Sequence, residues 1–177
     1  MLALPVLEVI KARGSIRSYR DKPIPKQILL DILEAARMAQ SAANCQPWEF
    51  IVVTDEGIKK KLAQAASNQS FVGEAAAVIV CLARPEDSAS VGPFEGFLID
   101  LTIAIENMVL TAWDLGVGSC WIGAYNEGKV KELLDVPRSL RVVSLLTLGY
   151  PDERAGPKYR KDLNEIIHYE RYGQKEH

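Results

Sequence analysis

A long apolar segment near the middle of the chain sets the strongest limit on the fold. Residues 97–115 read FLIDLTIAIENMVLTAWDL, and only Asp100, Glu106 and Asp114 among them are charged. Gly116 follows, and glycine commonly ends a helix, so the segment predicts one helix of about five turns. A helix that is apolar on nearly every side is stable in water only when protein covers it. We therefore expect a buried central helix, or one covered by a partner.

Four other segments have the composition of β-strands. They span residues 48–54, 76–83, 119–122 and 141–148, and the second, AAVIVCLA, is a continuous apolar run typical of a strand buried on both faces. Helices are expected over residues 5–13, 25–39, 56–66 and 127–134. Two helices therefore precede any strand, which favours an α+β fold with helices packed on one sheet. A chain of 177 residues has the size of a single domain, so one domain over 1–177 is expected.

Charge and cysteine content exclude several classes of protein. With 21 basic and 23 acidic side chains, the net charge of −2 gives no global basic field for nucleic acid or an anionic membrane. Uncharged apolar runs also stay shorter than the roughly 18 residues of a membrane span. Cys45, Cys81 and Cys120 are odd in number and widely spaced, which argues against a disulfide framework and a zinc site and makes the cytoplasm the natural compartment. Both histidines, His168 and His177, lie in the C-terminal tail, which argues against a His-based metal site.

The signatures of common nucleotide and hydrolase sites do not occur in the sequence. It contains neither GxxxxGK[ST] nor GxSxG. Gly116, Gly118 and Gly123 superficially resemble a dinucleotide fingerprint. That fingerprint runs from a strand into a helix, whereas these glycines follow a helix, so we reject this interpretation.

Two polar segments in the first third of the chain carry groups suited to a ligand. Arg13, Ser15 and Arg17 surround a helix-ending glycine, and guanidinium forks with a hydroxyl suit a phosphate. Asn44 and Gln46 lie in the polar turn 41–47, and their amides suit the alternating edge of a heterocycle. Taken singly, the first segment is more typical of a solvated basic turn, and the second is equally typical of a capped helix end and polar turn.

Two further segments lie in the second half. Residues 116–124, GVGSCWIGA, offer backbone without side-chain bulk that can lie against a flat ring. Residues 157–161, PKYRK, place three cations close together and could complete an anion site. Taken singly, the first of these segments is more typical of a tight helix-to-strand connection, and the second of a solvated charged face.

In combination, the four segments resemble the FMN-dependent nitroreductase family. The resemblance lies in RxSxR after the first helix, NxQPWxF after a polar turn, GxGSCWIGA after an apolar helix, and GYP followed by PKxR. It extends over residues 5–172, and NxQPWxF together with GSCWIG is its most specific part.

The resemblance implies a homodimer with a mainly antiparallel central sheet flanked by helices, two FMN sites at the interface, and a C-terminal tail that reaches the partner subunit. The helix at 97–115 would lie in the dimer core. The implied cofactor-binding residues are Arg13, Ser15, Arg17, Lys158 and Arg160 at the phosphate and ribityl end, Ser41, Asn44 and Gln46 from the partner subunit, and Ile122, Gly123 and Ala124 against the isoalloxazine.

The implied reaction takes a hydride from NADH or NADPH onto the flavin and passes the electrons to a small acceptor, such as a nitroaromatic or a quinone, in a ping-pong scheme. No side chain is then required as a catalytic acid or base. Specialised reactions of the same site, such as dehalogenation or flavin fragmentation, generally need a lid, and the loop 84–96 is short, so we expect an open pocket. Flavin storage or sensing without turnover, and a dimerisation domain that binds nothing, are the alternatives.

Overall fold

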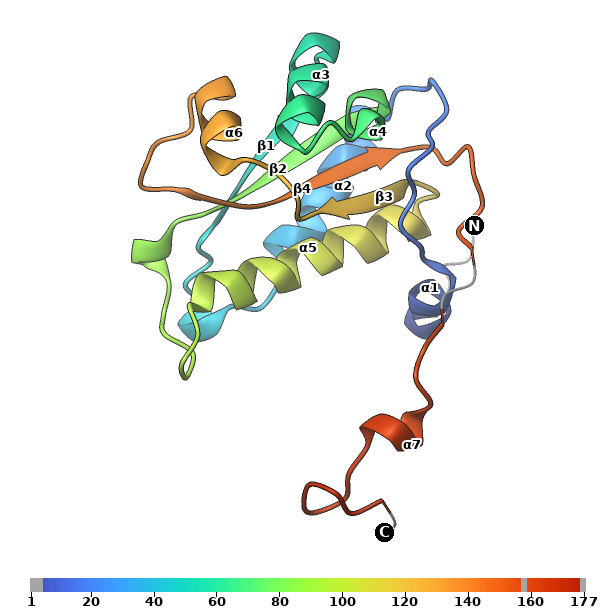
Figure 1. Ribbon diagram of the computed structural model, residues 1–177, viewed down its shortest axis with the longest axis vertical. Helices are drawn as coiled ribbons and strands as arrows, with labels where there is room; N and C mark the ends of the chain where they lie inside the picture. Colours follow the sequence, from blue (N-terminus) through green and yellow to red (C-terminus); the bar gives the residue numbers. More distant parts are fainter. Residues whose placement is uncertain (1–4, 157–158, 176–177) are drawn as a thin grey trace.

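The computed structural model describes residues 5–156 and 159–175, and a four-stranded sheet lies at its centre (Figure 1). The strands, in spatial order, are β1 (Trp48–Val53), β2 (Ala77–Ala83), β4 (Arg141–Gly149) and β3 (Gly118–Ile122). Each neighbouring pair is antiparallel. All seven residues of β2 are buried, as its apolar sequence predicted. The predicted α+β fold with a mainly antiparallel sheet is confirmed.

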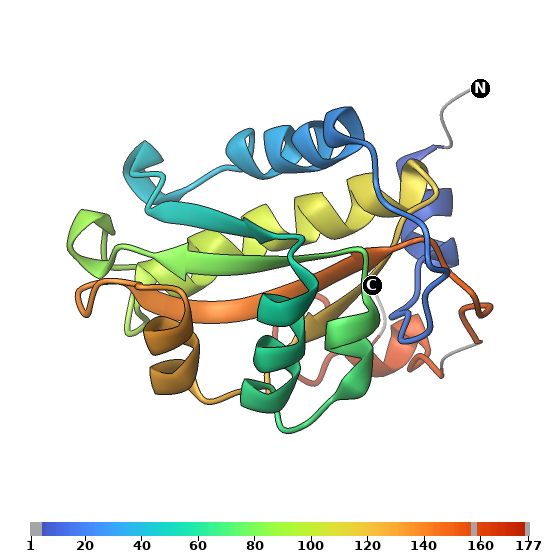
Figure 2. The same ribbon diagram turned by 90° about the horizontal axis from the view of Figure 1, so that it is seen from above.

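Helices cover both faces of the sheet (Figure 2). One face carries α2 (Lys26–Arg37) and α5 (Gly96–Asp114), and the other carries α3 (Glu56–Ala65), α4 (Ser70–Glu74) and α6 (Glu127–Leu133). Because successive strand residues point to opposite faces, β2 serves both cores: Ile79 packs toward α2 and α5, whereas Val78 and Val80 pack on the other side. The sheet is therefore the middle layer of three.

The predicted central helix is α5, and it ends one residue before the predicted boundary. Leu101, Ile105 and Met108 are fully buried against α2 and the sheet. Among the described residues, α5 is the one helix long and apolar enough to span a membrane. Half of its most apolar 18-residue stretch is, however, buried inside the protein, as in the core helix of a globular fold. Leu98 is exposed, so part of the opposite side of α5 is uncovered in one chain.

Local sequence signals fix the ends of several helices. Asp55 accepts a hydrogen bond from the Ile58 N–H at 2.8 Å and begins α3, and Asn126 accepts one from the Lys129 N–H at 2.9 Å and begins α6. Gly116 has a φ of +76°, which suits glycine, directly after α5. The two short helices α4 and α7 (Leu163–Ile166) were not predicted, because one turn is too short to show a helical period.

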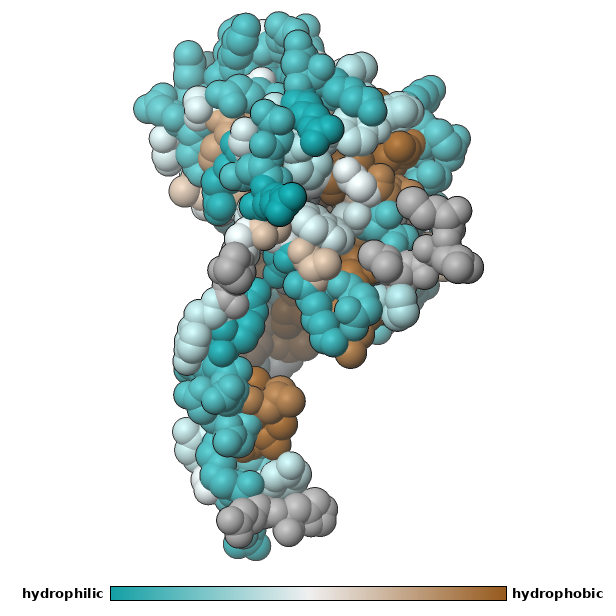
Figure 3. All heavy atoms as spheres, turned by 90° about the vertical axis from the view of Figure 1, so that its right-hand side faces the viewer, coloured by the Kyte–Doolittle hydropathy of each residue, from teal (hydrophilic) through white to brown (hydrophobic). Residues whose placement is uncertain are grey.

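The described residues nearest the two ends of the chain lie toward the same side of the body (Figure 1). The first helix, α1 (Val6–Ala12), sits there, and the segment after β4 leaves the body and extends away from it. Its apolar side chains gather on one side of the extension (Figure 3). The exposed apolar residues of this tail are Tyr159, Leu163, Ile166, Ile167, Tyr169 and Tyr172.

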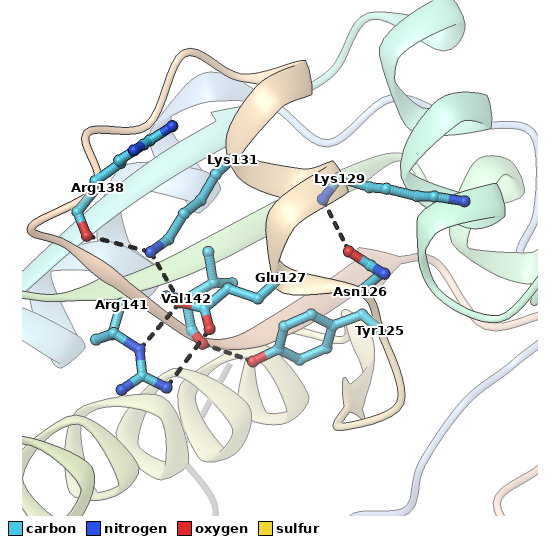
Figure 4. Close-up of polar contacts among 8 residues, drawn as sticks. All are labelled: Tyr125, Asn126, Glu127, Lys129, Lys131, Arg138, Arg141 and Val142. Carbon is cyan, nitrogen blue, oxygen red and sulfur yellow. Dashed lines mark hydrogen bonds and ion pairs between the residues drawn. The ribbon is translucent and has the colours of Figure 1, made fainter.

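A polar network closes the corner between α6 and β4 (Figure 4). The Glu127 carboxylate accepts a hydrogen bond from the Val142 N–H at 3.0 Å and pairs with Lys131 and Arg141, each at 3.1 Å. Partial burial acts to raise the pKa of Glu127, but the Val142 N–H and the two cations outweigh it and lower the pKa below its ordinary value. The carboxylate is therefore more stable in the folded than in the unfolded chain.

Replacing Glu127 by glutamine is expected to lower the free energy of unfolding by about 1 kcal/mol at neutral pH. Because the folded-state pKa is depressed, this contribution is present above the ordinary glutamate pKa of about 4.3 and is lost as the pH falls through the folded-state value. Urea unfolding at about pH 7 and about pH 3 measures the difference, which should be smaller at the lower pH. Glu132→Gln on the same helix, where the side chain is exposed, is the control. An equal loss at both pH values would contradict the ionic role.

Candidate functional site

The basic segment after α1 runs along the free edge of β3. Ser15 bridges Ser119 in parallel, and the Ile16 N–H donates to the Ser119 carbonyl at 2.9 Å. Ile16 is fully buried, and a Cβ added at Gly118 would lie 2.7 Å from its Cγ1, so only glycine admits this close approach. The sheet thus fixes the segment that carries Arg13 and Arg17.

Arg13 and Arg160 line one groove of about 630 Å³, together with Ile10, Ala155 and Gly156. The tail can cross the segment here because Gly14 has no side chain: an added Cβ would lie 2.4 Å from that of Ala155. The structure therefore brings together two of the predicted phosphate-binding cations from opposite ends of the chain. Lys158, predicted to join them, lies outside the described residues.

Arg17 and Ser15 are placed differently from Arg13. The Arg17 guanidinium lies 5.9 Å from the ring centre of Phe71 on α4, and Ser15 is half-buried against β3. In addition, the N–H groups of Arg17 and Ser18 both donate to Glu153 Oε1, at 2.5 and 3.1 Å. Glu153 follows β4 and carried no local sequence signal for this contact. Its carboxylate thus occupies two backbone N–H groups of the segment that carries the predicted phosphate-binding residues.

The turn between α2 and β1 has an unusual backbone. Ala43, Asn44 and Gln46 all have positive φ values, of 50°, 56° and 51°. Such values are uncommon outside glycine and are often found where function constrains the backbone. The turn is closed by the Gln46 N–H, which donates to Ser41 Oγ at 2.9 Å, and by Gln46 Nε2, which donates to the Asn44 carbonyl at 3.2 Å. Asn44 and Gln46 are exposed, and this geometry presents them together.

The predicted ring-binding turn at the end of β3 is open on one side. Ile122 is buried, whereas Gly123 and Ala124 are exposed. Among the described residues other than its two chain neighbours, no atom lies within 4 Å of a Cβ added at Gly123. Sequence reasoning missed the neighbour of this turn, the α3–α4 loop, from which Gln69 Nε2 donates to the Ala124 carbonyl at 3.4 Å. A flat ligand can therefore approach backbone at Gly123 without meeting a side chain.

These predicted site segments do not form one cluster within a single chain. The turn containing Asn44 lies at the N-terminal part of α5, because the Ala42 N–H donates to Asp100. The α1 helix, which Arg13 follows, lies beyond the other end of α5 (Figure 1), and Ser15 bridges Ser119 of β3. Asp100 and Asp114 are fourteen residues apart on α5, a separation of about 21 Å at 1.5 Å per residue. Within one chain, Arg13 and the Asn44 turn therefore lie at opposite ends of α5.

Comparison with known proteins identifies the class of this fold and site. A model of the Nitroreductase family matches residues 10–86 and 65–150, which together span most of the chain. A protein of Archaeoglobus fulgidus, provisionally named NADH dehydrogenase/NAD(P)H nitroreductase, is 40% identical over 151 residues, 83% of this chain and 86% of that protein. The chain belongs to the nitroreductase family.

Solved structures agree with this assignment. A nitroreductase family protein from Clostridium novyi NT has a TM-score of 0.81 and 38% identity, covering 97% of this chain and 96% of that one. An FMN-dependent nitroreductase from Clostridium difficile R20291 has a TM-score of 0.82 and 30% identity, covering 94% of this chain and 99% of that one. The similarity therefore extends over nearly the full length of both proteins.

Proposed function

We propose that this chain is an FMN-dependent NAD(P)H oxidoreductase that reduces small electron acceptors. Its relatives support this class of enzyme, because their names combine FMN or NAD(P)H with nitroreductase activity. The observation that carries the proposal is the groove shared by Arg13 and Arg160, since two guanidinium groups on separate segments suit a phosphate of about two negative charges. The flavin would supply the hydride chemistry when bound.

The residues proposed to hold FMN fall into three groups. They are Arg13, Ser15, Arg17, Lys158 and Arg160 at the phosphate and ribityl end, Ile122, Gly123 and Ala124 beside the ring, and Ser41, Asn44 and Gln46 from a second copy. The fit is supported by the charge in the groove and by the open backbone at Gly123. The protein's part is to orient the flavin and leave one ring face accessible to the nicotinamide and then to the acceptor, in alternating half-reactions.

The placement of the site segments supports a homodimer. In one chain the Asn44 turn and Arg13 lie at opposite ends of α5, whereas a second copy would bring one segment of each kind to a shared site. Apolar surface is available for that contact: α5 carries an apolar groove of about 470 Å³ with Phe94, Leu98 and Ile103 in its walls, and the tail is apolar on one side. We propose that residues 1–177 form one domain whose tail reaches the partner subunit.

The test of this function is an absorbance spectrum of the protein purified with FMN, before and after anaerobic NADH or NADPH. We expect flavin bands near ~450 nm that bleach with at least one donor and return when a quinone or nitroaromatic is added. Bands that persist with both donors would contradict the oxidoreductase and favour a flavin-binding protein without turnover. Colourless protein after incubation with FMN would contradict flavin binding altogether.

A further inference from the structure

Asp100 is a buried carboxylate that faces the Ser41–Gln46 turn from α5. Only 2% of the residue is exposed. Its Oδ1 accepts a hydrogen bond from the Ala42 N–H at 2.9 Å, which joins the second residue of the turn to the long central helix. Within residues 5–156 and 159–175, its Oδ2 is buried and has no hydrogen-bond partner.

Stability alone does not account for this carboxylate. Burying a charged group is costly unless it is paired, and an unsatisfied buried oxygen adds to that cost. An apolar residue of similar size would suit this side of α5, where Phe97 and Ala104, one turn before and after Asp100, are buried. Within the described part of the chain, the hydrogen bond that Asp100 accepts comes from the backbone of the turn, and this bond is therefore informative.

The turn needs an external support of this kind. Its conformation contains three non-glycine residues with positive φ, each of which is costly unless the surrounding structure holds it. On the β1 side, Pro47 is buried and its carbonyl accepts a hydrogen bond from the Arg84 N–H at 2.8 Å. On the α2 side, the hydrogen bond from Ala42 to Asp100 is the corresponding attachment. Asn44 and Gln46 lie between the two attachments.

We propose that Asp100 is a positioning residue for the flavin: its carboxylate holds Ala42, and thereby the backbone that presents Asn44 and Gln46 to the ring. The inference rests on the proposed function, because it assigns flavin contacts to this turn. Asp100 acts through the turn and not by touching the cofactor. This role requires a hydrogen-bond acceptor at residue 100, but it does not require a negative charge.

Two substitutions remove the same hydrogen bond from opposite sides. Asp100→Leu fills the space but accepts no hydrogen bond. Ala42→Pro deletes the N–H donor without touching α5, and the preceding Ser41, with φ −141° and ψ 156°, already has the extended backbone that proline requires of its neighbour. Asp100→Asn keeps an acceptor for Ala42. Met108→Ala, which opens a cavity in the buried face of α5, is the control for general destabilisation.

FMN titration of the full-length protein, followed by flavin fluorescence, is the first measurement, with the absorbance spectrum of the bound flavin as the second. We expect the Kd to rise at least about tenfold in Asp100→Leu and Ala42→Pro, with shifted flavin bands, and to stay within about threefold in Asp100→Asn and Met108→Ala. Amide hydrogen exchange without flavin should show loss of protection at Ala42 in Asp100→Leu and retained protection in Asp100→Asn.

The Asn44→Ala variant separates the inference from the function on which it rests. Weaker flavin binding in Asn44→Ala with unchanged binding in Asp100→Leu would overturn the inference and leave the function standing. An Asp100→Asn variant as weak as Asp100→Leu would also overturn it, because charge and not the hydrogen bond would be the cause. Wild-type protein that binds no FMN would overturn the proposed function, and the role of Asp100 with it.

Discussion

Replacing Arg13 by alanine is expected to weaken FMN binding by about 1.5–3 kcal/mol, the usual range for a hydrogen bond to a charged group. That loss corresponds to an increase in Kd of roughly 10- to 150-fold, since about 1.4 kcal/mol is tenfold. Arg13 is half-buried and lines the groove that it shares with Arg160, so its guanidinium is partly desolvated there. Titration of the apoprotein with FMN measures the change.

Companion variants identify the cause of that loss. Arg13→Lys keeps the charge but not the two-pronged guanidinium, so an intermediate Kd is expected. Arg37→Ala on α2 removes an exposed arginine that pairs with Glu34, and it should leave the Kd unchanged. If Arg13 and Arg160 hold the same phosphate, the effects of Arg13→Ala and Arg160→Ala should not add in the double variant. An unchanged Kd in Arg13→Ala would place the phosphate elsewhere.

Replacing Leu163 and Ile166 in the tail by aspartate is expected to raise the dissociation constant of the proposed homodimer at least about 100-fold. These side chains are 70% and 57% exposed in one chain, and both lie on the short helix α7. Burying a side chain of this size against a partner contributes roughly 1.5–3 kcal/mol, and a dimer contains the contact twice. Sedimentation equilibrium over a range of protein concentrations measures the dissociation constant.

The same variant tests whether the flavin site is shared between two chains. Because Arg160 is retained, FMN affinity should fall only at protein concentrations where the dimer dissociates. Asn164→Asp adds a charge to α7 without removing apolar surface, and it should preserve the dimer. A double-aspartate variant that remains dimeric would contradict the proposal that the tail contributes to the interface. A monomer with wild-type FMN affinity would contradict the shared site.

The elements that the sequence predicted well are those with long or continuous patterns. The apolar helix at 97–115, the buried strand at 76–83 and the family resemblance are confirmed by α5, β2 and the family match. In each case the signal lies in one uninterrupted segment, where periodicity and composition can be read directly. Local turn chemistry also sufficed at Gly116, whose positive φ follows the end of α5.

Features that depend on long-range contacts could not be predicted. The Glu153 carboxylate reaches the N–H groups of Arg17 and Ser18, more than a hundred residues earlier in the chain, and Asp100 reaches Ala42. Neither contact leaves a local pattern, because each residue alone is an ordinary acidic side chain on a helix or loop. The opposite positions of Arg13 and the Asn44 turn likewise follow from the packing of α5 and not from spacing in the sequence.

The attachment of Ser15 and Ile16 to β3, and of Arg17 to Glu153, also sets an order of events during synthesis. Residues 13–17 are synthesised before all of these partners, because β3 begins at Gly118 and Arg160 of the groove follows later still. Residues 13–17 therefore lack their native contacts while α2, β1 and β2 begin to pack. The groove is complete only once Arg160 lies beside Arg13, so under the proposed function FMN would be bound late in folding.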